Sequence, residues 1–551
     1  MTMASSGMRA ALAALVALGL AASAQADSSD VPRIATENGR HALIVDGEPF
    51  LMLAVQANNS SNYPSALGKV WPIVDQLEAN TLEIPVAWEQ IEPREGEFDF
   101  SWLDTLLPQA RAHGKKLVLL WFATWKNTSP AYAPAWVKLD NQRFPRLTNA
   151  AGETHYALSP HYHSTLEADK RAFVRLMGYL KTNDPANTVI MVQVENEPGS
   201  YGSVRDFSPV AQRLFDGPVP DALARHFDKP RGNWRQMFGA DADEYFHAWS
   251  IASYINEIAA AGKAVKPLPM YTNAALASAF GRQAAPTYAS GGPVHHVIDI
   301  YKAAAPALDL VTPDIYVRDT AAYNAYLGFY DRKDNPLFVP ETGNDVEYSR
   351  FFFPVVGRGG IGFSPFGMDA TGYFNFPLGA KDFDPTLNLF ARNYHLFAPI
   401  QRQWAKWALA GKTWGVAEPT DPAAGHSQQL DLGKYKVSAT FGQFQFGTDK
   451  PVGNPRPTGG IAIAELGPDE YLVTGFDTRV NFSLASPAPN QSMMYVRVEE
   501  GHFDKGRWVF ERVWNGDQID YGLNFTGLPQ LLRVRLGSYR GSPVIPVGNP
   551  N

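Results

Sequence analysis

Eight short apolar runs, separated by segments with helical periodicity, constrain the fold of this chain more than any other feature. Short runs of apolar and β-branched residues are typical of buried parallel strands. A parallel strand must be followed by a crossover, which is usually a helix, so the alternation predicts a (β/α)8 TIM barrel of the α/β class. The predicted strands are Leu51–Gln56, Thr81–Trp88, Lys116–Phe122, Val189–Glu195, Pro269–Ala274, Leu308–Tyr316, Pro336–Glu341 and Gly360–Pro365.

Helical patterns fill the gaps between these runs, and the clearest four are Trp102–His113, Glu167–Lys181, Ala242–Ala261 and Tyr323–Tyr330. The gap after the fourth strand, residues 200–240, is rich in proline, glycine and aromatic residues. We expect it to form an extended loop over the barrel mouth, because long connections in barrel proteins often cover the site.

The sequence changes character after about Trp414, where strict alternation of apolar and polar residues replaces helical periodicity. Alternating runs punctuated by glycine, proline and asparagine predict an all-β sandwich or jelly-roll-like domain. The predicted division is therefore a barrel over residues 27–415 and a β-domain over residues 416–551.

The first 26 residues have the pattern of a secretory signal peptide. Arg9 precedes the apolar stretch 10–22, and Ala24-Gln25-Ala26 follows as a small-x-small cleavage site. This order of regions predicts export, and the apolar stretch is too short for a comfortable membrane span. We therefore expect a periplasmic or secreted protein with no membrane partner once the signal peptide is removed.

Composition excludes several classes of function. The chain has no cysteine, which excludes disulfides, thiolate nucleophiles and thiolate metal sites. Its formal net charge of −7 offers no basic surface for nucleic acid. The spacing of His155, His161 and His163 matches no metal motif. The sequence thus predicts neither a metal nor a cofactor, and it leaves the oligomeric state open.

Two of the predicted strands end in glutamates, at Glu195-Asn196-Glu197 and at Glu341. Barrel enzymes keep their chemistry at the carboxyl ends of the strands. Two carboxyl groups from different strands are the minimum for hydrolysing a glycosidic bond, which needs no metal. Alternation would send Glu195 and Glu197 to the same side, but Pro198-Gly199 turns the chain, so periodicity does not choose between them.

The phrase Gln193-Val194-Glu195-Asn196-Glu197 resembles the signature of glycoside hydrolase family 35, a β-galactosidase family of the clan of retaining barrel glycosidases. Residues 80–100 resemble the second strand and following loop of the same family, and the β-domain resembles one found in a bacterial subgroup. The resemblance implies that Glu197 is the acid/base, Asn196 the donor to the sugar 2-hydroxyl, and Glu341 the nucleophile. The chain departs from the signature at residues 183–185 and at Pro198.

The resemblance implies a glycoside hydrolase (EC 3.2.1.23), a retaining exo-β-galactosidase that removes terminal β-D-galactosyl residues from oligo- or polysaccharides such as xyloglucan side chains. The sequence leaves open a different sugar specificity or an endo mode of cleavage, as in a β-glucosidase, a β-glucosaminidase or an endo-glucanase. It also leaves open an inactive carbohydrate-binding protein. For a general acid we expect a raised pKa at Glu197.

Further candidates for carbohydrate binding lie near the ends of the predicted strands. Tyr316 lies at the end of strand six, where members of the clan often place a tyrosine that holds the nucleophile. Glu195 is expected to support the site from behind. The remaining predicted substrate-binding residues are Trp88, Glu89, Trp125 and Asn127.

Overall fold

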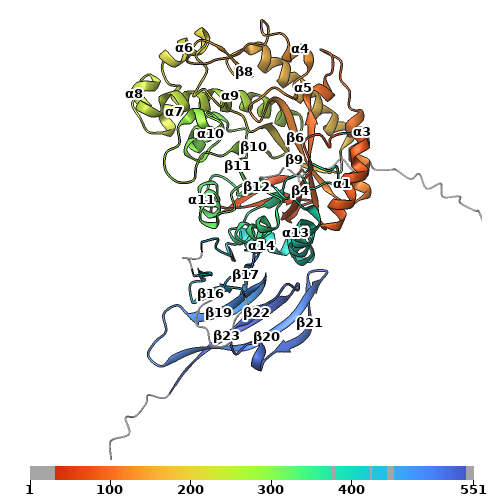
Figure 1. The fold of residues 1–551 in the computed structure, drawn as a ribbon, viewed down its shortest axis with the longest axis vertical. Helices are drawn as coiled ribbons and strands as arrows, with labels where there is room; N and C mark the ends of the chain where they lie inside the picture. The colour runs from red at the N-terminus through yellow and green to blue at the C-terminus, as the bar shows by residue number, and fades with distance from the viewer. Residues whose placement is uncertain (1–30, 374–378, 422–424, 443–451, 542–551) are drawn as a thin grey trace, which may run out of the picture.

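The computed structural model describes residues 31–373, 379–421, 425–442 and 452–541. The predicted signal peptide lies outside these described residues. The described chain has two parts, a barrel surrounded by helices and a smaller domain of antiparallel strands (Figure 1).

The predicted barrel is confirmed as a closed ring of eight parallel strands in the order β10-β11-β12-β13-β4-β5-β6-β9. All eight strands coincide with the predicted runs. Their bounds are β4 (Met52–Gln56), β5 (Thr81–Ala87), β6 (Lys116–Lys126), β9 (Val189–Asn196), β10 (Met270–Ala275), β11 (Leu310–Ile315), β12 (Phe338–Thr342) and β13 (Gly362–Pro365). Strand β6 continues four residues past its predicted end at Phe122, whereas Trp88 leaves β5 and begins helix α2 (Trp88–Ile91).

A small antiparallel sheet that the sequence did not predict precedes the barrel. It consists of β1 (Arg33–Glu37), β2 (Arg40–Val45) and β3 (Glu48–Phe50). Its residues Leu43, Val45 and Phe50 share one apolar cluster with barrel residues such as Met52 and Ile190. Because Met52 and Ile190 lie at the starts of their strands, this sheet closes the amino-terminal end of the barrel and leaves the opposite end for the site.

The helices that cover the barrel follow the predicted pattern, and the four predicted helices are confirmed within a few residues. The bounds are α1 (Pro64–Gln76), α3 (Ser101–Ala112), α4 (Ala135–Lys138), α5 (His163–Asn183), α6 (Pro209–Asp216), α7 (Asp221–His226), α8 (Trp234–Phe238), α9 (Ala242–Val265), α10 (Ile298–Ala304), α11 (Thr320–Tyr330), α12 (Phe352–Gly357), α13 (Phe383–Phe397) and α14 (Gln401–Leu409). Among the described residues, no helix combines the length and apolar character that a membrane span requires.

Residues 200–240 differ from the prediction, because they contain helices α6, α7 and α8 rather than one extended loop. Two of these helices begin with side-chain caps: Ser208 accepts a hydrogen bond from the backbone of Ala211, and Asn233 forms a capping box with Gln236. Trp234 is buried in the core cluster that also includes α9. Local capping and this apolar contact make short helices more stable here than open loop.

The carboxyl-terminal domain is a β-sandwich, as predicted. One sheet has the order β14-β17-β18-β23-β20-β21 and the other β15-β16-β19-β22, with an apolar cluster of their residues between them. The strands are β14 (Thr413–Ala417), β15 (Ser427–Asp431), β16 (Tyr435–Phe441), β17 (Gly460–Gly467), β18 (Glu470–Phe476), β19 (Thr478–Leu484), β20 (Gln491–Asp504), β21 (Arg507–Trp514), β22 (Leu523–Phe525) and β23 (Leu531–Arg540). A two-stranded sheet of β7 (Arg146–Thr148) and β8 (Thr154–Leu158) completes the described strands.

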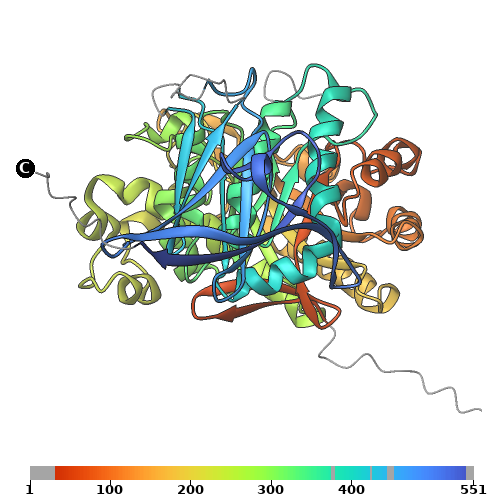
Figure 2. The same ribbon diagram turned by 90° about the horizontal axis from the view of Figure 1, so that it is seen from below.

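The two domains meet where α12 packs against β14 and β17, and Figure 2 shows the sandwich strands in front of the barrel. The contact is close because two glycines face each other: a Cβ on Gly357 would lie 2.1 Å from the backbone nitrogen of Gly415. Polar contacts flank it, since Arg392 pairs with Asp477 at 3.0 Å and Arg350 donates to the carbonyl of Glu418 at 3.2 Å.

Replacing Gly357 with alanine should destabilise the protein, because the added methyl group has backbone rather than a movable side chain in its way. We expect a loss of about 1–3 kcal/mol, the usual cost of overpacking. The matched control is Gly178→Ala in α5, where a Cβ meets nothing within 4 Å. Thermal unfolding should show a lower midpoint for Gly357→Ala and an equal or higher one for Gly178→Ala; equal midpoints for both variants would contradict the close contact.

Candidate active site

The carboxyl ends of three barrel strands bring three acidic side chains together. Glu197 follows β9, Asp314 lies in β11, and Glu341 lies in β12. Each of the three has a carboxylate oxygen within 4.8 Å of an oxygen on each of the other two. The barrel thus places the two predicted glutamates side by side, 144 residues apart in the sequence, and adds an aspartate between them.

Hydrogen bonds fix the carboxylate of Glu341, which is only 4% exposed. Its Oε1 accepts from Gln56 Nε2 at 3.0 Å and from Asn196 Nδ2 at 3.3 Å, and its Oε2 accepts from the Tyr316 hydroxyl at 3.0 Å. Donors at three other strand ends thus fix the orientation of the Glu341 carboxyl group. They engage both of its oxygens.

The backbone of Glu197 is held in an unusual conformation. Both Glu195 and Glu197 have left-handed backbone angles, with φ of +64° and +43°. Such residues cost on the order of 1–3 kcal/mol each and persist only where the surroundings enforce them. Here the Glu197 N–H donates to Asn273 Oδ1 at 2.9 Å, and its carbonyl accepts from the Thr128 N–H at 3.0 Å. The neighbouring strands therefore fix the position of the Glu197 side chain.

The electrostatics separate the two glutamates. Burial and the negative charge of Glu341 raise the pKa of Glu197 to about 7, while the Lys126 ammonium opposes that rise. This direction is the one expected for a general acid. Burial, followed by Glu341, also raises the pKa of Tyr316 well above its usual range, so Tyr316 remains a neutral donor. With a pKa of about 7, Glu197 can hold a proton near neutral pH, next to Glu341.

Glu195 faces away from the pair. Its oxygens accept from the backbone N–H of Trp125 at 2.6 Å and of Thr124 at 3.4 Å. Burial, and then Asp169, raise the pKa of Glu195 well above its usual value. Glu195 therefore ties β9 to β6 behind the site rather than facing a ligand.

The two predicted tryptophans lie in the protein interior and are fully buried. Trp88 donates from Nε1 to Glu92 at 3.0 Å. Trp125 donates to the carbonyl of Leu158 at 3.3 Å and packs edge-on against Tyr254 with ring centroids 4.8 Å apart. Neither ring presents a face on which a sugar could stack, because the strand-end apolar positions they occupy point into the helix layer.

The predicted polar residues Glu89 and Asn127 are engaged with lysines. Glu89 forms an ion pair with Lys138 at 2.8 Å. Asn127 is exposed, at φ +49°, and its amide oxygen accepts a hydrogen bond from Lys126. Asn127 thus stands beside a cation that acts on Glu197, whereas no described contact joins Glu89 to the pair.

Asn273 and Glu83, which the sequence did not single out, belong to the site, and so does Gln56, the last residue of the first predicted strand. Asn273 bridges Glu197 and Asp314, and Gln56 orients Glu341. Next to Gln56 in the barrel register lies Glu83, which accepts from the Tyr271 hydroxyl at 2.9 Å and whose pKa burial raises to about 8. These polar residues interrupt apolar strands, and that interruption was the available signal.

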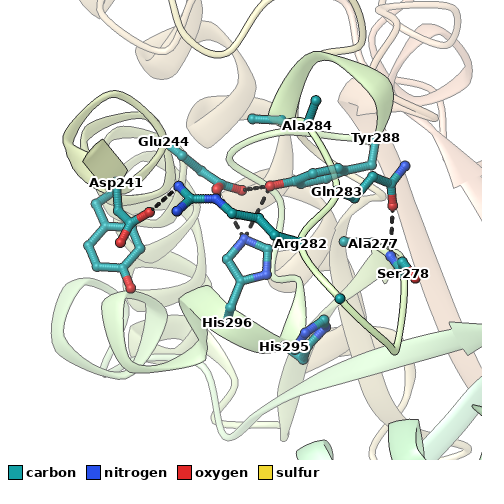
Figure 3. A pocket seen from close by; sticks show the side chains of 13 residues that line it. Asp241, Glu244, Ala277, Ser278, Arg282, Gln283, Ala284, Tyr288, His295 and His296 are labelled. Carbon is teal, nitrogen blue, oxygen red and sulfur yellow. Dashed lines mark hydrogen bonds and ion pairs between the residues drawn. The ribbon is translucent and has the colours of Figure 1, made fainter. Parts of the chain in front are cut away.

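A separate cavity of about 720 Å³ lies beside the start of α9, the loop after β10 and the short turn at His295–Val297 (Figure 3). Within it Glu244 accepts from the Tyr288 hydroxyl at 2.6 Å and contacts His296 Nε2 at 3.0 Å. Neither Glu197 nor Glu341 lines this cavity. The acidic cluster and this cavity are therefore distinct features.

Comparison with known proteins supports a glycosidase domain. The family model for β-galactosidases of glycoside hydrolase family 42 matches residues 69–264, and a domain of unknown function (DUF5597) matches residues 390–526. The resemblance to family 35 is not confirmed, since the β-galactosidase model that matches is that of family 42. The departures at residues 183–185 and at Pro198 lie before the start and after the end of β9.

Two curated relatives are similar over a short stretch. β-Galactosidase BgaA of a Thermus species is 30% identical over 138 residues, or 24% of this chain and 19% of that protein. The β-galactosidase of Thermus thermophilus is 29% identical over 138 residues, with the same coverage of 24% and 19%. The match thus spans about a fifth of the length of these relatives.

Among solved structures, the β-galactosidase of Bacillus circulans sp. alkalophilus aligns with a TM-score of 0.50 and 10% identity, covering 88% of this chain and 99% of that chain. At this identity the likeness concerns the fold alone. The part of the barrel over residues 69–264 is therefore similar to β-galactosidase domains of the family 42 type.

Proposed function

We propose that this protein is a retaining exo-β-galactosidase. The observation that carries the proposal is the closeness of Glu197 and Glu341, since one carboxylate oxygen of Glu197 lies within 4.8 Å of one carboxylate oxygen of Glu341. Retaining glycosidases separate their two carboxyl groups by about 5–5.5 Å, whereas inverting enzymes need about 6.5–9.5 Å to admit a water. The short separation favours direct attack by a carboxylate.

The two glutamates take different roles because their surroundings differ. Glu341, held by donors on both oxygens, attacks the anomeric carbon and forms a covalent glycosyl-enzyme. Glu197, protonated near neutral pH, gives its proton to the leaving oxygen. Loss of the Glu341 charge then lowers the pKa of Glu197, which takes a proton from the water that releases the sugar. Glu197 thereby regains the proton that it gave to the leaving oxygen, and the attack of water on the anomeric carbon frees Glu341.

The proposed substrates are terminal β-D-galactosyl residues on oligosaccharides or polysaccharides, such as xyloglucan side chains. The choice of galactose is supported by the family 42 match and by the names of the curated relatives. Asn196 donates to Glu341 and keeps its own amide oxygen without a hydrogen-bond partner among the described residues. That buried oxygen can accept a bond from a sugar hydroxyl next to the nucleophile.

The purified protein should hydrolyse p-nitrophenyl β-galactoside faster than the β-glucoside. Glu341→Gln should lose at least about 1,000-fold in kcat, because it removes the nucleophile. In Glu197→Ala, hydrolysis of the glycosyl-enzyme should limit the rate, because no general base activates the water. Azide should restore activity, because this anion attacks the glycosyl-enzyme without a general base.

Proton NMR of the products supplies the stereochemical control. We expect the β-anomer of galactose to appear first and the α-anomer to follow by mutarotation. Initial release of the α-anomer would contradict the retaining mechanism, and folded protein that hydrolyses neither aryl glycoside would contradict the proposed activity.

The pH dependence of kcat/KM should report the free-enzyme pKa of Glu197. Because the acid form is required, kcat/KM should fall as the pH rises through about 7. The Lys126 ammonium lowers the pKa of Glu197, so Lys126→Met should move this basic limb to higher pH. A limb that stays in place or moves to lower pH in Lys126→Met would contradict this assignment.

We also propose that the protein is exported, on the basis of Arg9, the apolar stretch 10–22 and Ala24-Gln25-Ala26. Expressed in a Gram-negative host, it should accumulate in the periplasm or medium. Intact-mass measurement should give a chain beginning at Asp27; full-length chain in the cytoplasm alone would contradict export.

A further inference from the structure

Asp314 is a third carboxyl group inside the proposed catalytic pair. It is 3% exposed and has an oxygen within 4.8 Å of both Glu197 and Glu341. The two-glutamate mechanism assigns it no role. An ionised carboxylate in this position would add a third negative charge to a crowded, buried cluster.

The contacts of Asp314 are unequal on its two oxygens. Oδ2 accepts from Asn273 Nδ2 at 2.6 Å. Oδ1 is buried and receives no hydrogen bond from any group in the part of the chain that the structure describes. The same Asn273 accepts the N–H of Glu197 at 2.9 Å, so one amide links Asp314 to the backbone of the acid/base.

The charges around Asp314 favour its neutral form. The facing titratable and charged groups are Glu197, Glu341, Lys126, Tyr271, Tyr316 and Tyr330. Lys126 is the only cation in this set, against two other carboxyl groups. Burial, then Glu341 and Glu197, raise the pKa of Asp314 well above its usual value. A proton on Oδ1 replaces repulsion between two carboxylates with a hydrogen bond.

We propose that Asp314 is a positioning residue that stays protonated and donates a hydrogen bond from Oδ1 to the Glu197 carboxylate. This inference rests on the proposed function of Glu197. Only the proton of Glu197 is transferred, first to the leaving oxygen and later back from water, while the Asp314 proton stays in place. The hydrogen bond orients the Glu197 carboxylate for its second task, as a base toward water.

Two substitutions separate this role from the alternatives. Asp314→Asn cannot ionise, but its amide can still accept from Asn273 with oxygen and donate to Glu197 with nitrogen. Asp314→Ala can do neither. We expect kcat of Asp314→Asn to lie within about 5-fold of wild type and kcat of Asp314→Ala to fall about 100-fold or more, with a smaller change in KM.

The direction of the pH shift is the second readout. A hydrogen bond from Asp314 lowers the pKa of Glu197. The basic limb of kcat/KM should therefore move to higher pH in Asp314→Ala and stay near its wild-type position in Asp314→Asn. If Asp314 instead acts as an anion, Asp314→Asn and Asp314→Ala should lose the same amount of activity. The basic limb of kcat/KM should then move to lower pH in each of the two variants. Either that result, or a basic limb that stays at its wild-type position in both variants, would overturn the proposal.

A measurement on the free protein keeps this test separate from the proposed activity. At pH 7, the infrared difference spectrum of wild type minus Asp314→Asn should contain one protonated-carboxyl band. Bands of an ionised carboxylate would overturn the inference even in an active enzyme. If the protein hydrolyses no galactoside but the protonated band is present, the proposed function fails while the protonation of Asp314 stands. Thermal unfolding of both variants checks that they are folded.

Discussion

Closure of eight parallel strands is the constraint on which the rest of the structure depends. Because the strands run in one direction, every strand ends at the same rim, and residues from remote parts of the sequence must meet there. Gln56, Asn196, Asp314 and Glu341 come from four different strands and touch or nearly touch. The small sheet at the opposite end blocks the other rim, so polar groups have a single open end to face.

The geometry at the rim depends on a break in strand regularity. A regular β9 would place Glu195 and Glu197 on the same side. The left-handed angle at Glu195 instead turns its side chain toward β6, while Asn196 and Glu197 lie next to Glu341. Thr128, also left-handed at φ +64°, donates to the carbonyl of Glu197, so β6 and β9 hold each other's strained ends. This mutual support makes a costly conformation persistent.

The barrel and the sandwich could be predicted because each rests on a repeated pattern: apolar runs alternating with helical segments, then strict alternation of residues. Glu341 could be predicted as a strand-end acid. Glu197 could not be chosen over Glu195 by periodicity, since backbone angles of +64° and +43° leave no signal in a two-residue repeat. Trp88 and Trp125 were misleading because aromatic residues at strand ends serve packing as readily as binding, and both are buried. The contribution of Asn273 depends on a register between β9 and β10 that only the three-dimensional structure supplies.

Charge balance connects the fold to the chemistry at this rim. Three carboxyl groups and one facing ammonium group, that of Lys126, cannot all be ionised in a buried cluster without strong repulsion. The hydrogen-bond donors differ between the three groups. Among the described residues, Glu341 receives hydrogen bonds from three side chains and Asp314 from that of Asn273, while Glu197 lies close to both and has a raised pKa of about 7. The unequal distribution of amide and hydroxyl donors, rather than any difference between the acids themselves, therefore distinguishes the surroundings of the three carboxyl groups.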